Sequence, residues 1–293
     1  MHFTGTVWRP PYEAWSALMQ VTEGCTHNKC KFCTLYSNVP HFRVSSAAEI
    51  EEDLRELYAA APDVTRLFLT GANPFALSSE RLKEIANLSK QYLQRLDSIG
   101  CFARVTDVSS KSVAELKDLR ALGFNRITIG VETGDDAALK FMRKGYRAED
   151  IITGCRKLDS ANMEYNFFYL TGISGSGNGL AAAEKTAEIF NELNPRIVGA
   201  SMLTVFPDSD LYEEILSGNW HEESETEKLL EMKKLIEKLE IRTHFAALGA
   251  SNMFNLHGEL PCERAELTEQ IDKVLNEFSE TELRSYRENL KHL

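Results

Sequence analysis

Residues 17–33 read ALMQVTEGCTHNKCKFC, a short apolar run that leads directly into a loop with three cysteines. The run Ala17–Val21 has the length and composition of a buried strand. The cysteines follow it at Cys25, Cys30 and Cys33. Barrel enzymes carry their active sites at the carboxyl ends of their strands, so this loop has the position of a functional loop.

The same alternation of an apolar run with an amphipathic segment continues outward along the chain. Further strands are expected at Arg66–Thr70, Cys101–Val105, Arg126–Val131, Glu164–Leu170 and Ile197–Val205. Helices are expected at Ala47–Ala61, Ser79–Leu96, Ser112–Leu122, Asp135–Arg143, Ala148–Ala161 and Leu180–Leu193. Repeated strand–helix units imply parallel strands joined by right-handed crossovers. The pattern predicts an α/β fold, a partial (β/α)6 TIM-like barrel with a C-terminal helical extension.

The pattern changes after Pro207. A long charged amphipathic helix is expected over Glu222–Leu239, an irregular segment over Ala246–Leu260, and helix from Glu263 onward. These segments hold few apolar residues for a core of their own. We therefore predict a core barrel over residues 1–206 and a mostly helical extension, packed on the barrel, over residues 207–293.

Composition excludes several classes of protein. The 293 residues carry a formal net charge of −11, which lacks the broad basic footprint of a nucleic-acid binder. A local basic patch around Arg143, Lys144 and Arg147 could still hold one anionic ligand. No apolar run has the length of a membrane span, and the N-terminal residues lack the apolar region of a signal peptide. A cytoplasmic protein is expected.

The clustered cysteines indicate metal binding rather than a disulfide framework. Iron–sulfur cubanes ordinarily take four thiolates, so a loop with three leaves one iron open to a substrate or cofactor. The alternative is a structural zinc site in which His27 or a distant cysteine is the fourth ligand. Zinc sites usually come as two paired ligand sets, and the chain has no second CxxC or HxxxH. Both metals stay open on the loop alone.

The spacing Cys25-x4-Cys30-x2-Cys33 resembles the cluster motif of radical S-adenosylmethionine enzymes, which usually have three residues in the first gap. Phe32 matches the aromatic residue that precedes the last cysteine in that family, and its backbone typically lies against the adenine. The resemblance implies that the three cysteines are catalytic and hold a 4Fe-4S cluster. It also implies S-adenosyl-L-methionine as the second cofactor, and it extends to oxygen-independent coproporphyrinogen-oxidase-like relatives.

The turn after the second strand contains Gly71, Ala72 and Asn73. In the family, a glycine-rich turn here binds the methionine amino group through backbone carbonyls, because small residues let the backbone approach a ligand. Gly71 matches this pattern, whereas Ala72 stands where a second glycine is common and Asn73 where an acid is common. An ordinary turn of Gly, Asn and Pro is the alternative.

The remaining site residues follow later strands. The resemblance implies that Glu132, after the fourth strand, accepts hydrogen bonds from both ribose hydroxyls. The alternative for Glu132 is a strand-end acid that caps the next helix. Lys144, with Arg143 as second choice, aligns with the basic residue that pairs with the methionine carboxylate; a solvated basic helix end is the alternative. Met202 lies in the run that walls the adenine pocket, or else in ordinary barrel core.

Arg104 near the third strand end is a candidate for cofactor binding or substrate contact if it faces the barrel mouth; a surface position is the alternative. Further candidate substrate contacts are Tyr169, Asn252 and His257. The glycine-rich segment Thr171–Gly177 lacks the Lys-Ser/Thr of a phosphate loop. Three scattered residues, Cys101, Cys155 and Cys262, are expected as buried small hydrophobes.

The resemblance implies a radical enzyme that cleaves S-adenosylmethionine to methionine and a 5′-deoxyadenosyl radical, which abstracts hydrogen from an organic substrate. An electron donor such as flavodoxin or ferredoxin is the expected partner. Two alternatives stay open: a zinc-binding or interaction protein without redox chemistry, and a heme-pathway chaperone built on the same core.

Overall fold

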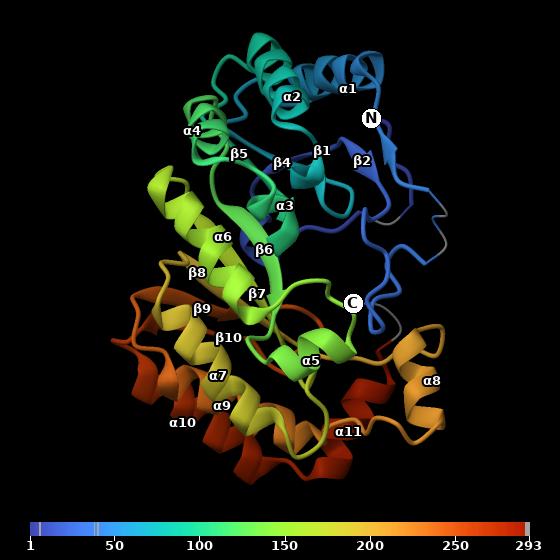
Figure 1. The fold of residues 1–293 in the computed structure, drawn as a ribbon, viewed down its shortest axis with the longest axis vertical. Coiled ribbons are helices and arrows are strands. Elements are labelled where there is room, and N and C mark those ends of the chain that lie inside the picture. Colours follow the sequence, from blue (N-terminus) through green and yellow to red (C-terminus); the bar gives the residue numbers. More distant parts are fainter. Residues whose placement is uncertain (6, 38, 40, 291–293) are drawn as a thin grey trace. The chain divides into compact units, whose positions relative to one another are not determined.

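The computed structural model describes residues 1–5, 7–37, 39 and 41–290 (Figure 1). The strands are β1 (Ala17–Gln20), β2 (Thr22–Glu23), β3 (Arg43–Val44), β4 (Arg66–Thr70), β5 (Ser98–Ala103), β6 (Ile127–Glu132), β7 (Tyr165–Thr171), β8 (Ile197–Met202), β9 (Thr243–Ala247) and β10 (Leu256–Leu260). The helices are α1 (Ala47–Ala60), α2 (Ser79–Tyr92), α3 (Val105–Ser109), α4 (Val113–Ala121), α5 (Asp136–Phe141), α6 (Ala148–Ser160), α7 (Gly179–Asn191), α8 (Asp210–Leu216), α9 (Glu225–Lys238), α10 (Arg264–Glu277) and α11 (Glu280–Glu288).

The main sheet in the described residues has eight strands in the order β1-β4-β5-β6-β7-β8-β9-β10. The pairings of β1 with β4, β4 with β5, and β5 with β6 are parallel. Those of β7 with β8 and β8 with β9 are also parallel, whereas β10 runs antiparallel to β9. The six strands expected from the sequence are therefore neighbours in chain order, and the predicted α/β fold of a partial TIM-like barrel is confirmed.

Local sequence explains where these elements lie. Strand β6 is buried along nearly its whole length, as expected for a parallel strand with side chains covered on both faces. Helix α1 begins with a capping box in which Ser46 and Glu49 satisfy each other's backbone N–H groups. Helix α4 begins in the same way with Ser112 and Glu115. These caps fix the starts of the helices that follow β3 and α3.

The chain divides into two compact units, and each is described by itself. Unit 1 comprises Met1–Asn28, Leu35–Gly130 and Thr153–Tyr165. In unit 1, α2 packs against both α1 and α4 (Figure 1). Unit 2 comprises Lys29–Thr34, Val131–Ile152 and Asn166–Leu293.

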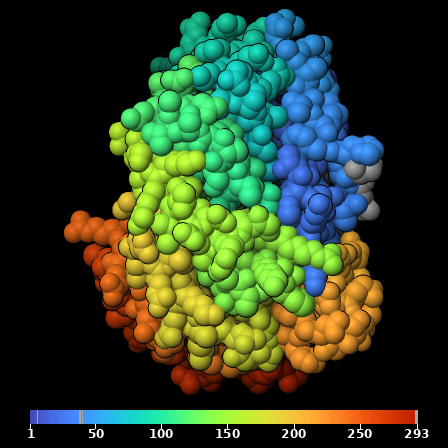
Figure 2. Space-filling model, viewed as in Figure 1, coloured from blue at the N-terminus to red at the C-terminus, as the bar shows by residue number. Residues whose placement is uncertain are grey.

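Unit 2 contains the segment after Pro207 together with β8 and all of β7 except Tyr165. Helix α9 packs against α7, α10 and α11, and β9 continues the sheet beside β8. In Figure 2, residues of α5 and α7, in yellow-green and yellow, lie at the surface of this unit. The segment after Pro207 is thus joined to the strands before it through helix packing and sheet hydrogen bonds.

The expectation of an irregular segment over Ala246–Leu260 is wrong at both ends of that range. Strand β9 extends to Ala247, and β10 occupies Leu256–Leu260. Along β10 the buried residues alternate with exposed ones, which is the period of a strand with one covered face. The strand is only five residues long and contains a glycine and a histidine, so its apolar signal in the sequence is weak.

Candidate functional site

In unit 1, the first part of the cysteine loop is fastened to the turn after β4. Cys25 is half-buried and has a free thiol. The next residue, Thr26, donates its backbone N–H to Asn73 Oδ1 at 3.2 Å, and its Oγ1 accepts from Asn73 Nδ2 at 2.7 Å. One asparagine side chain therefore holds the backbone and the side chain of the residue that follows Cys25.

The same Asn73 amide also binds a buried acid. Its Nδ2 donates to Asp107 Oδ2 at 2.9 Å, and the Arg104 backbone N–H donates to that oxygen at 2.8 Å. Burial raises the pKa of Asp107, while these two hydrogen bonds act in the opposite direction. Both N–H positions of Asn73 are thus occupied by Thr26 and Asp107, and the asparagine acts as an internal link.

Arg104 lies at the start of a helix rather than within a strand. The strand expected over Cys101–Val105 ends at Ala103, and α3 begins at Val105 with Arg104 as its N-cap. The Arg104 guanidinium donates to Thr106 Oγ1 at 2.9 Å. The prediction of strand through Val105 was wrong because the Asp107 carboxylate caps the backbone N–H at Arg104 and starts a short helix there.

The turn after β4 has little conformational freedom. Gly71 has φ +108°, and a Cβ at this position would lie 1.7 Å from the carbonyl oxygen of Thr22. Ala72 also adopts a positive φ of 59°, which is uncommon for a residue with a side chain. Its backbone N–H donates to the Tyr36 hydroxyl at 2.8 Å. Close backbone packing therefore requires glycine at position 71 independently of any ligand.

Lys111 supports this turn and was not identified from the sequence. The side chain is buried, and its Nζ donates to the carbonyls of Phe75 and Leu77 at 2.7 and 3.0 Å. Burial lowers the pKa of this lysine. A buried lysine that bonds two carbonyls of one turn fixes the path of the chain just after Asn73.

In unit 2, the second part of the cysteine loop forms a turn of its own. The Cys33 N–H donates to the Cys30 carbonyl at 3.2 Å, and both thiols are half-buried and free of disulfides. Between them, Lys31 donates its N–H to the Met142 carbonyl at 3.3 Å and accepts from the Leu211 N–H at 2.8 Å. The turn that carries the two cysteines is therefore held by main-chain bonds on both sides.

The Lys31 side chain adds an ionic contact. Its Nζ lies 2.5 Å from Glu214 Oε1 on α8 and 3.8 Å from the centre of the Phe141 ring. The lysine is buried, and Glu214 is only partly exposed. A cation over an aromatic face and beside a carboxylate has two favourable electrostatic contacts. Helix α8, from the C-terminal segment, is thereby tied to the cysteine turn.

Glu132 and Lys144 form a buried ion pair in unit 2. Lys144 Nζ lies 3.0 Å from Glu132 Oε1, and the side chains are 5% and 11% exposed. The ammonium also lies 5.6 Å from the centre of the Phe32 ring. Burial opposes the charged form of this lysine, but the charges of Glu132, Tyr146 and Cys30 outweigh burial and raise its pKa. Two of the residues expected from the resemblance thus lie together beside Phe32.

The two basic candidates after α5 have different surroundings. Along residues 142–147 buried and exposed residues alternate, so Lys144 lies inside and Arg143 outside. Arg143 is more than half exposed, and its Nη1 donates to Asp210 at 3.1 Å on the surface. The buried position of Lys144 matches that of a residue that recognises an anionic group away from water.

Met202, at the carboxyl end of β8, is buried, and its sulfur accepts a hydrogen bond from Arg287 at 3.3 Å. Tyr169 is also buried and donates its hydroxyl to Glu231. Asn252 is buried and donates to the Ala200 carbonyl at 3.0 Å, whereas His257 is exposed on β10.

The scattered cysteines are of two kinds. Cys101 and Cys155 are buried, and burial raises the pKa of both thiols. The expectation that they are small hydrophobes is consistent with this burial. Cys262 is exposed, so the expectation of burial was wrong for it. It lies in the turn between β10 and α10, where side chains face solvent.

Backbone N–H groups of the glycine-rich segment after β7 are bonded to carboxylates of the same unit. Gly172 donates its N–H to Glu231 at 2.6 Å, and Gly177 donates to Glu227 at 2.8 Å. These N–H groups therefore have internal acceptors, and the segment offers them to α9 rather than to a phosphate.

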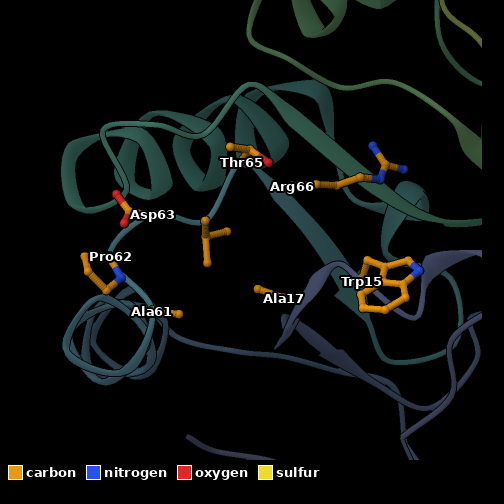
Figure 3. Close-up of a pocket in the computed structure, with 8 residues that line it drawn as sticks. Trp15, Ala17, Ala61, Pro62, Asp63, Thr65 and Arg66 are labelled. Atoms are coloured by element: carbon orange, nitrogen blue, oxygen red, sulfur yellow. The ribbon is translucent and has the colours of Figure 1, made fainter.

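A cavity of about 340 Å³ lies in unit 1 (Figure 3). It is lined at the amino ends of β1 and β4 by Ala17 and Arg66, by the preceding turn at Pro62 and Asp63, and by the exposed Trp15. Because barrel chemistry takes place at the carboxyl ends of the strands, this cavity is not the candidate site.

Charged residues buried beside β7 and β8 were missed altogether. Glu225, Lys228 and Glu231 on α9 are fully buried, and Arg287 on α11 is almost so. In the sequence these residues follow the pattern of a solvated charged helix face. Only their tertiary contacts identify them as internal.

Comparison with known proteins places these features in a family. The model of the "Radical SAM superfamily" matches residues 19–181, which is more than half of the chain. The chain is 26% identical over 206 residues to "Heme chaperone HemW" of Bacillus subtilis (strain 168), covering 67% of this chain and 53% of the relative. The chain thus spans about half the length of that relative.

Solved structures show the same fold. The radical S-adenosylmethionine methyltransferase TsrM from Kitasatospora setae, with cobalamin and a [4Fe-4S] cluster bound, gives a TM-score of 0.57 at 20% identity, covering 69% of this chain and 39% of that chain. Methylornithine synthase (PylB) also gives 0.57, at 14% identity over 92% of this chain and 85% of that chain. Sequence match and fold agree, and the chain belongs to the radical SAM superfamily.

Proposed function

We propose that this protein is a radical S-adenosylmethionine enzyme in which Cys25, Cys30 and Cys33 hold a 4Fe-4S cluster. The observation that carries the proposal is the buried pair of Glu132 and Lys144 beside Phe32, in the unit that contains Cys30 and Cys33. Three half-buried cysteines that form no disulfide are a suitable donor set for iron and leave one cluster position for another ligand.

Membership of the superfamily implies a 4Fe-4S cluster and S-adenosylmethionine as cofactors. When bound, the reduced cluster supplies an electron that splits S-adenosylmethionine into methionine and a 5′-deoxyadenosyl radical, which abstracts hydrogen from the substrate. The protein contributes binding, orientation and exclusion of water. We propose a reduced flavodoxin or ferredoxin as the electron donor and an organic molecule, still to be identified, as the substrate.

Lys144 binds the methionine carboxylate in this proposal. Its ammonium is buried and keeps its charge because Glu132 and the neighbouring negative groups stabilise it. Glu132 accepts from the ribose hydroxyls, since a carboxylate that bonds one lysine retains further lone pairs. Arg143 pairs with Asp210 at the surface, which favours Lys144 as the carboxylate partner.

Gly71 and Ala72 offer backbone carbonyls to the methionine amino group in the proposal. The Asn73 side chain is used by Thr26 and Asp107, so its role is to hold the cysteine loop. Phe32 and Met202 line the adenine side, and Arg104 is proposed near the substrate. The division into a core over residues 1–206 and an extension over residues 207–293, and the cytoplasmic location, stay predictions from the sequence.

Anaerobic reconstitution with iron and sulfide tests the proposal. We expect about four iron atoms per chain and formation of 5′-deoxyadenosine after addition of dithionite and S-adenosylmethionine. Cys30→Ser abolishes both, whereas Cys262→Ser, which changes an exposed cysteine outside the loop, leaves both unchanged. A colourless protein that retains one zinc ion after reconstitution contradicts the proposal and favours a structural metal site.

A second candidate is a heme chaperone on the same core, favoured by the name of the Bacillus subtilis relative. It predicts that the reconstituted protein binds heme, seen as a Soret band whose absorbance rises in proportion to the heme added. It also predicts no 5′-deoxyadenosine despite an intact cluster. Heme titration and nucleoside analysis on one preparation therefore distinguish the two candidates.

A further inference from the structure

The carboxyl ends of β7 and β8 are held by charged groups from α9 and α11. Glu225, Lys228 and Glu231 recur every third residue, which places them on one face of α9. We call these three residues the α9 charged face. All three are fully buried. A buried charge is costly unless it is paired, so each contact of this face has to be accounted for.

Glu231 binds the end of β7. One carboxylate oxygen accepts from the Gly172 N–H at 2.6 Å, and the other accepts from the Tyr169 hydroxyl. Gly172 has φ +86°, and a Cβ there would lie 3.0 Å from Lys228 Cε. The turn after β7 is therefore pressed against the stem of Lys228 and bonded to Glu231.

Lys228 and Glu225 bind the end of β8. Lys228 Nζ donates to the Leu203 carbonyl at 3.0 Å, to Glu225 Oε1 at 3.1 Å and to Glu222 Oε1 at 2.7 Å. Glu225 in turn pairs with Arg287 at 2.9 Å.

Arg287 extends this chain of contacts to the residues around the strand end. It donates to Thr204 Oγ1 at 2.8 Å and to the Met202 sulfur at 3.3 Å. The links from α9 to the end of β8 thus end on the Leu203 carbonyl directly and, through Arg287, on the Thr204 hydroxyl and the Met202 sulfur.

We propose that the α9 charged face is a positioning device: it sets the turn after β7 and the residues Met202–Thr204 at the end of β8, and so shapes the adenine side of the S-adenosylmethionine pocket. This inference rests on the proposed function for the ligand, but the positioning itself rests on the contacts above. An apolar face would pack α9 equally well, since replacing buried ion pairs with hydrophobic groups is often neutral or stabilising. Directional bonds to Gly172, Leu203 and Met202 instead fix where the two strand ends lie.

The test compares Glu231→Leu with Leu235→Ala. Glu231→Leu removes both acceptors at β7 while keeping an apolar group of similar size. Leu235→Ala makes a cavity on the same buried face of α9, one turn after Glu231, and leaves the three charged side chains in place. Glu231→Gln keeps an acceptor for Gly172 and serves as the rescue. Arg287→Lys loosens the β8 end and is the second variant if Glu231→Leu does not fold.

In reconstituted protein we expect Glu231→Leu to weaken S-adenosylmethionine binding about tenfold at unchanged iron content. Glu231→Gln stays near wild type, Arg287→Lys is weakened severalfold, and Leu235→Ala lowers the unfolding temperature without changing affinity. In protein without the cluster, amide exchange at Gly172 is faster in Glu231→Leu than in Leu235→Ala.

Equal exchange at Gly172, or equal affinity losses, in Glu231→Leu and Leu235→Ala would overturn the inference. If Glu231→Leu does not fold, unchanged affinity in Arg287→Lys overturns it instead. A wild-type protein that carries the cluster and does not bind S-adenosylmethionine defeats the proposed function and with it the pocket assignment. Exchange at Gly172 in the cluster-free variants still decides the positioning.

Discussion

The cysteine loop is held in two chemically different ways in the two units. In unit 1, Thr26 is bound by neutral hydrogen bonds from Asn73, which links it to the buried Asp107. In unit 2, the turn of Cys30 and Cys33 is held by the ion pair of Lys31 with Glu214 and by main-chain bonds.

This difference follows from what each part of the loop lies against. Asn73 lies in the turn after β4 and Asp107 in the first turn of the short helix α3 after β5, where short polar side chains can bond backbone groups. Lys31 and Lys144 lie near aromatic rings, where a cation is stabilised by the ring face and needs a carboxylate partner when buried. We call the contacts of Thr26, Asn73 and Asp107 the neutral side, and it depends on the geometry of its hydrogen bonds. We call the pairs of Lys31 with Glu214 and of Lys144 with Glu132 the ionic side, and it depends on paired charges.

Loss of Lys144 is expected to have the largest effect on the ionic side. Lys144→Met leaves the Glu132 carboxylate without its partner in a nearly buried position. Breaking a buried pair costs about 3–5 kcal/mol, so we expect the free energy of unfolding of the cluster-free protein to fall by that amount. Denaturant titration measures it. The double variant Glu132→Gln, Lys144→Met recovers part of the loss; a double variant less stable than Lys144→Met contradicts the assignment.

The neutral side is expected to give a smaller loss. Asn73→Ala removes the acceptor of the Thr26 N–H and a donor to the buried Asp107. Leaving such groups unsatisfied costs about 1–3 kcal/mol. Asn87→Ala, at an exposed position of α2 in the same unit, is the matched control and changes the free energy of unfolding little. If denaturant titration shows equal losses in the free energy of unfolding for the two variants, Asn73 does not stabilise the cysteine loop.

Much of the ionic side could be predicted from sequence, and little of the neutral side. Glu132 and Lys144 follow a recognisable strand and match a family motif, so their functional roles were expected before their contact was known. Asn73 was expected to face the ligand, because nothing in its local sequence indicates that Thr26 and Asp107, far apart in the chain, occupy its amide. The α9 charged face was missed because charges at helical spacing are the usual pattern of a solvated surface.

Two carboxyl groups in unit 2, those of Glu223 and Glu231, predict that the free energy of unfolding depends on pH. Glu223 is fully buried, and neither of its carboxylate oxygens has a hydrogen-bond partner among the described residues. Burial and the charge of Glu231 raise the pKa of Glu223 to about 9, and burial raises the pKa of Glu231 to about 7. Glu227 adds to the shift at Glu223, Tyr169 donates to Glu231, and Lys228 opposes both shifts.

The sign follows from proton binding. Above the ordinary pKa of 4.5 the unfolded chain has released protons that the folded protein retains. The free energy of unfolding therefore falls as the pH rises from about 4.5 to about 9, by up to about 1.4 kcal/mol per pH unit for each retained proton. Glu223→Gln flattens this dependence, whereas Glu222→Gln does not. Denaturant titrations at pH 6 and pH 8 measure how much the free energy of unfolding changes with pH. The same change in wild type and in Glu223→Gln would refute the retained proton.

The smallest change in the free energy of unfolding is expected at Glu214, the partly exposed partner of Lys31. Glu214→Gln removes the charge that faces Lys31 but leaves an acceptor, and the main-chain bonds of Lys31 to Met142 and Leu211 remain. Because the carboxylate is partly in water, its loss changes unfolding less than Asn73→Ala does. The effect should instead appear in salt: iron loss to a chelator is faster than wild type at low ionic strength and equal to it at high ionic strength. Glu213→Gln, the exposed neighbour, serves as control, and a rate difference that persists in high salt would show that shape rather than charge holds the turn.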